Sequence, residues 1–156
     1  KFFIVLSNIL IVNSRKSYDQ YNLLEDAELK FFSQNGEDGI IDYIIQKLGL
    51  KKPSFVEIGI GDYSESNTRL LYETYYSNGL VVDILKDLKE KVSSNLYYGA
   101  SLNAYIKLME EKGYYLLGIN RLRNNAFFIN NDFPKKNFFK KNKNIFNFFY
   151  KVSKND

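Results

Sequence analysis

Cysteine and histidine are both absent from the sequence. Without cysteine the chain has no disulfides, no thiolate metal site and no cysteine nucleophile. Without histidine it lacks the commonest zinc ligand and the commonest general base near neutral pH. We therefore expect no metal site, and any chemistry must use carboxylates, lysine, tyrosine, asparagine or the positioning of reactants alone.

The composition is that of a folded chain with an uneven charge. A length of 156 residues suits one domain, and 45% hydrophobic and 17% aromatic residues are not typical of disorder. Residues 135–156 carry seven lysines against one aspartate, a charge of +6, which leaves −2 for the first 134 residues of a chain whose net charge is +4. A nucleic-acid surface across the whole domain is not supported, and we expect no nucleic-acid partner.

The two ends of the chain differ from its middle. Residues 2–12 are apolar on nearly every side, which predicts a helix that packs on the domain. This run has the length of a signal-peptide core but no small-residue cleavage site, and it is short for a membrane span, so we expect a cytoplasmic protein. We divide the chain into an apolar helix and linker (1–24), a domain (25–133) and a basic, aromatic tail (134–156). A peripheral membrane role for both ends remains the alternative.

Hydrophobic spacing predicts helices and strands between these ends. Helices are expected at 23–32, 40–48, 66–78, 85–94 and 101–113, with Gly49 and Gly79 just past the ends of the second and third. Strands are expected at 55–60, 79–84, 114–119 and 125–130. The first two strands flank a helix and should be parallel, whereas the short "NRLRN" connection predicts that the last two form an antiparallel hairpin.

Two segments carry residues of chemical interest. In "SQNGEDG", Ser33, Asn35 and Asp38 are helix-capping types, and its acidic residues have two open interpretations, ligand contact or capping. In "FVEIGIGDYSESNT", a strand ends in a glycine loop that leads to a helix, which lets a ligand approach the backbone.

The acids beside the glycine loop indicate which ligand it would take. Asp83, 24 residues after Gly59, ends the next strand, where a carboxylate can bind ribose hydroxyls. Glu57 would repel a phosphate and attract an ammonium group, which favours S-adenosylmethionine over NAD. Tyr63 is a candidate for stacking on adenine, with simple packing as its alternative. A plain strand–turn–helix connection with a partly exposed Glu57 is the alternative for the whole loop.

The segments "FFSQNGEDGIIDYII", "FVEIGIGDYSESNTRLL" and "NGLVVD" together resemble the FkbM-type methyltransferase-like proteins, within the class I S-adenosylmethionine-dependent methyltransferases. The resemblance covers roughly residues 25–133. It implies a Rossmann-like α/β sheet and transfer of a methyl group to oxygen on a sugar, a glycan or another small hydroxylated acceptor. It also implies that the cofactor lies against Glu57, Gly59, Gly61, Asp62 and Asp83.

The chain departs from that family in two places. Ser64 occupies the position of the third loop glycine. After about residue 85, the segment that carries the central strands and an Asp-rich turn in the family has no counterpart, so we expect a shortened sheet in which the first two strands lie beside the hairpin. No catalytic residue is indicated. The alternative to a methyltransferase is a non-catalytic binding or structural remnant of that fold.

Overall fold

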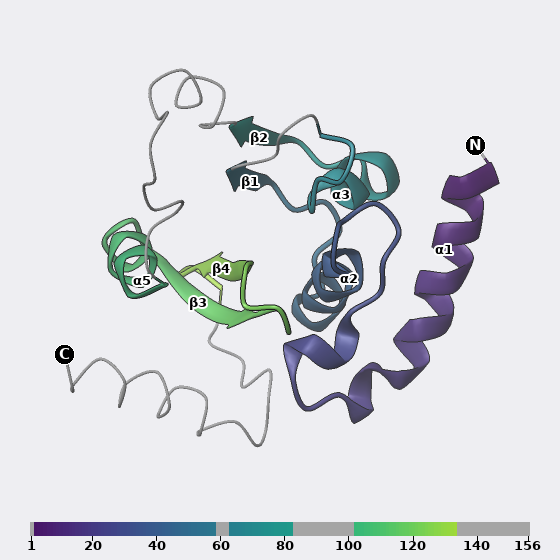
Figure 1. Cartoon of the computed structure of the whole chain (residues 1–156), viewed down its shortest axis with the longest axis horizontal. Helices are drawn as coiled ribbons and strands as arrows, with labels where there is room; N and C mark the ends of the chain where they lie inside the picture. The colour runs from purple at the N-terminus through teal and green to yellow at the C-terminus, as the bar shows by residue number, and fades with distance from the viewer. Residues whose placement is uncertain (1, 59–62, 83–101, 134–156) are drawn as a thin grey trace, which may run out of the picture. The chain divides into compact units, whose positions relative to one another are not determined.

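A computed structural model describes residues 2–58, 63–82 and 102–133 of the chain (Figure 1). These residues form a mixed α/β structure with one parallel pair of strands and one antiparallel hairpin. The chain divides into two compact units, one made of Lys1–Asp19 with Ala27–Tyr97 and the other of Gln20–Asp26 with Tyr98–Asp156.

The first unit begins with two helical segments and a third helix further on. Helix α1 (Phe2–Ser14) is followed by the 3-10 helix η1 (Arg15–Gln20), and α2 spans Glu37–Leu48. The predicted helices at 2–12 and 40–48 are thus confirmed. Gly49 ends α2 in the left-handed conformation, with a φ of 67° and its N–H directed to carbonyl oxygens of the last turn, as a C-terminal glycine allows.

The predicted helix at 23–32 is wrong. Only a 3-10 turn, η2 (Leu24–Ala27), forms there. The backbone N–H groups of Phe31 and Phe32, which an α-helix would direct to preceding carbonyls, both donate instead to the carboxylate of Asp38. Side-chain acceptors compete with helical hydrogen bonds in this way, and here the tertiary contact prevails over helix propensity.

Strands β1 (Phe55–Ile58) and β2 (Gly79–Val82) pair in parallel, which confirms the predicted orientation (Figure 1). The predicted continuations at 59–60 and 83–84 lie outside the described residues. Gly79 is opposite Phe55, and a Cβ at Gly79 would come within 2.4 Å of the Phe55 ring. Glycine at this position therefore leaves room for the aromatic side chain of the neighbouring strand.

Helix α3 (Arg69–Tyr75) connects β1 to β2 and is shorter than predicted. It begins after Thr68 rather than at residue 66, since the segment just before Thr68 is hydrogen-bonded to the side chain of Glu57. It ends at Tyr76, which adopts a left-handed conformation with a φ of 50°. The prediction that Gly79 lies just past the helix end is wrong, since Tyr76 reverses the chain and Gly79 already belongs to β2.

The core of the first unit lies where α1, α3 and the segment before α2 meet. Its buried members are Ile11, Phe32 and Leu70, and Ile4, Leu29, Phe31 and Tyr75 pack against them. Burial of each large apolar side chain contributes about 1.5–3 kcal/mol. This packing holds one face of α1 against α3.

The second unit contains α5 (Leu102–Glu111) and a hairpin of β3 (Tyr114–Ile119) and β4 (Ala126–Asn130). The strands are antiparallel, with a bulge between Leu116 and Gly118, so the predicted hairpin is confirmed. Within the residues described, β1–β2 and β3–β4 are two-stranded sheets of different units, and the expected placement of the first strands beside the hairpin stays a prediction. The helix predicted at 85–94 and the tail from residue 134 lie outside the described residues.

Candidate functional site

Glu57 is the central residue of the candidate site. Its half-buried side chain projects from β1 toward the segment that leads into α3. Oε1 accepts a hydrogen bond from the backbone N–H of Asn67 at 2.8 Å. Oε2 accepts three, from Ser66 Oγ at 2.5 Å, from Thr68 Oγ1 at 2.5 Å and from the Thr68 N–H at 3.0 Å. The carboxylate therefore fastens the end of a strand to the start of the following helix.

This arrangement satisfies groups that would otherwise lack partners. The first N–H groups of a helix have no acceptor within the helix, and a carboxylate near them also interacts favourably with the helix dipole. Thr68, the cap of α3, makes no capping bond with its own side chain. Glu57 supplies the acceptor instead, from eleven residues earlier in the sequence.

The same geometry bears on whether Glu57 can also hold an ammonium group. An ionised carboxylate offers about four acceptor positions, two on each oxygen. From the described residues, Oε2 accepts three donors, more than its two positions, whereas Oε1 accepts the Asn67 N–H. With respect to these described donors, Oε1 has room for one further N–H, such as that of an ammonium ligand.

Tyr63 precedes the same segment and adopts a left-handed backbone conformation, with a φ of 69°. Burial raises the pKa of its hydroxyl above the usual value, and the charges of Glu57 and Glu73 raise it further, while a hydrogen bond to Thr68 opposes them. The hydroxyl therefore lies within the electrostatic influence of Glu57. Of the six predicted cofactor-binding residues, these two are described, and Gly59, Gly61, Asp62 and Asp83 lie outside the described residues.

Arg69 is the first residue of α3. Its Nη1 donates to the carbonyl oxygen of Ser64 at 3.0 Å, and its guanidinium lies 4.8 Å from the ring centre of Phe32. Glu73 lies one turn along, 3.7 Å from Nε. These contacts give Arg69 a structural role in ordering the segment before α3.

The two acidic residues of the "SQNGEDG" segment accept hydrogen bonds within the protein. Asp38 is fully buried, and its Oδ2 accepts bonds from the N–H groups of Phe31, Phe32 and Ser33 and from Ser33 Oγ. Glu37 is also buried and accepts the Asn35 N–H at 2.8 Å. Asp38 therefore caps the loop that precedes α2.

Burial raises the pKa of Asp38, and the hydrogen bonds from the loop oppose that effect. Its second oxygen, Oδ1, is buried without a hydrogen-bond partner, which explains why the charged form is disfavoured. Asp38 therefore acts as a capping residue, but it caps the N–H groups of the preceding loop rather than those of its own helix. The N-cap position of α2 is Gly36.

A second polar cluster surrounds Asp42 and was missed in the sequence. Asp42 is fully buried in α2, and its carboxylate accepts hydrogen bonds from Arg15, from the Tyr18 hydroxyl at 2.7 Å and from the Tyr75 hydroxyl. Gln46 donates to Tyr75 at 3.2 Å. The only sign of this cluster in the sequence is that Asp42, a charged residue, lies between the apolar positions of the helix predicted at 40–48.

The pKa shifts around Asp42 reflect burial and the ion pair. The hydrogen bond to Asp42 raises the pKa of Arg15, so the guanidinium stays charged. Burial, followed by the influence of Asp42, raises the pKa of Tyr75, and burial is also the largest cause of the raised pKa of Tyr18. All the donors are thus held in their proton-bearing forms, as a structural ion-pair network requires.

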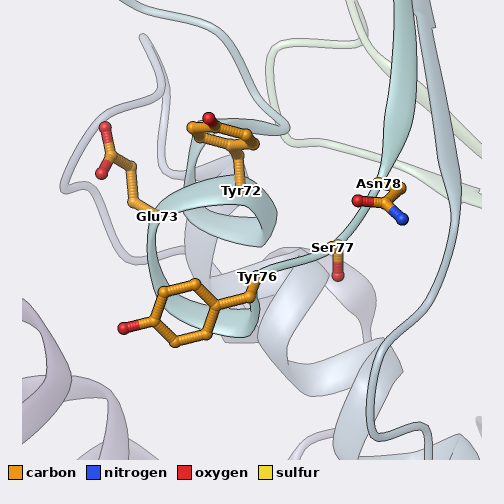
Figure 2. A pocket seen from close by; sticks show the side chains of 5 residues that line it. All are labelled: Tyr72, Glu73, Tyr76, Ser77 and Asn78. Atoms are coloured by element: carbon orange, nitrogen blue, oxygen red, sulfur yellow. The ribbon is translucent and has the colours of Figure 1, made fainter.

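An open pocket of about 300 Å³ lies at the other end of α3. Figure 2 shows Tyr72 and Tyr76 extending from successive turns of the helix, with Ser77 and Asn78 on the chain that leads into β2. Because β1 and β2 are parallel, this is the edge at which the strands begin, whereas Glu57 lies near the edge at which they end. The pocket is therefore separate from Glu57.

Comparison with known proteins adds no assignment: no protein-family model matches the chain, and neither do curated proteins or solved structures. Within residues 2–58, 63–82 and 102–133, no helix has the length and apolarity needed to cross a membrane. Over the same ranges, no group of three or more acidic side chains is placed to bind a metal ion.

Proposed function

We propose that the chain is an S-adenosylmethionine-dependent methyltransferase-like domain that transfers a methyl group to oxygen on a sugar or another small hydroxylated acceptor. The observation that carries the proposal is the carboxylate of Glu57, which lies at the end of a strand, in a parallel strand–helix–strand unit, with acceptor capacity left on Oε1. Ligands of open α/β sheets bind at that edge. A cytoplasmic location is part of this proposal.

Each residue has a role that its chemistry allows. S-adenosylmethionine, when bound, supplies the methyl group. Glu57 accepts an N–H from the cofactor ammonium while it orders the start of α3, Gly59 and Gly61 let the ligand approach the backbone, and Asp83 accepts hydrogen bonds from ribose hydroxyls. Asp62 and Tyr63 complete the binding segment. Positioning can supply much of the rate for an in-line displacement, so the absence of histidine is compatible with this reaction.

The test measures binding of S-adenosylmethionine to the full chain by calorimetry. We expect binding in the wild type, and a loss of roughly tenfold or more in affinity in Asp83→Ala, because a hydrogen bond to a charged group contributes about 1.5–3 kcal/mol. Asp132→Ala is the matched control, since Asp132 is an exposed aspartate beyond β4. No heat at millimolar cofactor, or equal affinities in all three proteins, would refute the proposal.

The second candidate function is a non-catalytic binding or structural remnant of the same fold. The observation that favours it is that the Glu57 carboxylate already accepts hydrogen bonds from Ser66, Asn67 and Thr68 within the protein. A remnant retains the fastening of α3 by Glu57 because the fold needs it. It predicts a cooperatively folded protein that binds no S-adenosylmethionine, so the calorimetric measurement also separates these two functions.

A further inference from the structure

Helix α1 has an apolar surface that its own unit does not cover. It contains no charged residue from Phe2 to Ser14. Ser7 and Ile11 are buried, with Ile4 packed against the core, and Figure 1 shows α1 at the margin of its unit, beside α3. The opposite side, here called the outer face of α1, consists of side chains that are 42–57% exposed: Val5, Leu6, Ile9, Leu10 and Val12.

Five aliphatic side chains on one helix are more than scattered surface residues. Contiguous apolar patches on soluble surfaces mark sites of protein or membrane contact. A helix that is apolar on all sides is stable only when both sides are covered, and α3 covers one of them. The outer face of α1 therefore needs a partner.

The charge around the outer face indicates the kind of partner. Asn13 is exposed at the C-terminal end of the helix, and the ammonium of Lys16 lies 3.3 Å from its Oδ1. An apolar face with a cation at its rim suits the boundary between lipid headgroups and acyl chains, where lysine can extend its amine toward the headgroups. The neighbouring Arg15 is turned inward to Asp42.

The sequence of the basic, aromatic tail (134–156) also favours binding to an anionic membrane surface. Residues 135–156 combine a charge of +6 with five phenylalanines and a tyrosine. Each lysine near an anionic leaflet contributes about 1 kcal/mol, and aromatic rings favour the headgroup region.

We propose that the outer face of α1 binds the surface of an anionic membrane, with α1 lying along the bilayer and its inner side remaining on α3. This function is independent of methyl transfer, because the residues that carry it are Val5, Leu6, Ile9, Leu10, Val12 and Lys16.

Flotation with vesicles tests the proposal on the full chain. The wild type is expected to float with vesicles of phosphatidylserine mixed with phosphatidylcholine. Ile9→Glu should lower the partition coefficient roughly tenfold or more, because a carboxylate replaces an aliphatic group at the lipid boundary. Leu122→Glu is the matched control, since Leu122 is 64% exposed in the hairpin turn, and it should float like the wild type. Circular dichroism verifies that both variants are folded.

A fluorescent probe separates α1 from the tail. The sequence contains no tryptophan, so Ile9→Trp and Leu122→Trp each introduce a single reporter. We expect a blue shift on addition of the mixed vesicles only in Ile9→Trp. Flotation without that shift means that the tail alone binds lipid, and it overturns the proposal. Unchanged flotation in Ile9→Glu, accompanied by conversion of a dimer to a monomer in sedimentation, assigns the face to a second copy and also overturns it.

Discussion

Nε of Arg15 lies 3.0 Å from Oδ2 of Asp42, and Nη2 lies 2.7 Å from Oδ1, so the turn after α1 is joined to the middle of α2 by a two-pronged ion pair. Tyr75 connects α3 to the same carboxylate. Because Asp42 is fully buried and Arg15 is only 32% exposed, the pair holds three elements together at one point.

Removal of this carboxylate should therefore be costly. We expect Asp42→Ala to lower the free energy of unfolding by about 3–5 kcal/mol, because it leaves a half-buried guanidinium without its partner. Asp19→Ala is the control, since Asp19 is 96% exposed and its bond to Lys47 should contribute less than about 1 kcal/mol. Urea unfolding measures both. A similar loss in the two variants would contradict the interpretation of Asp42 as a junction.

The fastening of α3 by Glu57 predicts a local effect. Glu57→Ala should destabilise the protein by about 1–3 kcal/mol, because several donors lose their acceptor at once. It should also speed hydrogen exchange at the N–H groups of Asn67 and Thr68. Glu65→Ala, at an exposed acid of the same segment, should change neither quantity appreciably. Unaltered exchange at Asn67 in Glu57→Ala would show that the carboxylate does not order the helix start.

The conformation of Tyr76 predicts a stabilising substitution. A left-handed backbone costs an L-residue roughly 1–2 kcal/mol, and the Tyr76 side chain is 76% exposed, so little packing is lost on its removal. Tyr76→Gly should raise the thermal midpoint. Tyr72→Gly, four residues earlier and inside α3, should lower it, since glycine in a helix interior costs about 1 kcal/mol. If both variants lose stability, the end of α3 is not strained.

The buried carboxyl of Asp38 predicts a pH dependence. Its pKa is raised in the folded state by burial. The folded protein therefore holds a proton that the unfolded chain loses above its ordinary aspartate pKa of 3.8, and the contribution of Asp38 to stability falls as pH rises through the folded-state pKa. As pH rises from about 3.8 through the folded-state pKa of Asp38, the difference in free energy of unfolding between the wild type and Asp38→Asn should decline, as measured by urea unfolding at each pH. Parallel stability curves would exclude the raised pKa.

Several features of the fold follow from local patterns. The apolar spacing within 40–48 and the stop at Gly49 are sufficient to predict α2, and the parallel orientation of β1 and β2 follows from the helix between them. The short "NRLRN" connection predicts the hairpin. These inferences succeed because the spacing of apolar residues and the length of a connection act over a few residues of chain.

The same reasoning identified Glu57 as the acid of interest but not what it binds within the protein. Its partners are nine to eleven residues away and meet it only once the segment before α3 folds back to the end of β1. The helix predicted at 23–32 was wrong for a related reason, because Asp38 accepts N–H groups that lie six or seven residues earlier. Side-chain acceptors at such separations leave no periodic trace in a sequence.

Composition and periodicity thus established the absence of thiol and imidazole chemistry, the order of most helices and strands, and the acid beside the glycine loop. Packing of distant segments determined that Asp42 joins Arg15 to Tyr75, that Glu57 fastens α3, and that the described part of the first unit leaves one side of α1 uncovered. The reason is physical: local propensity acts between neighbours in the chain, whereas burial and ion pairing depend on which residues the folded backbone brings together.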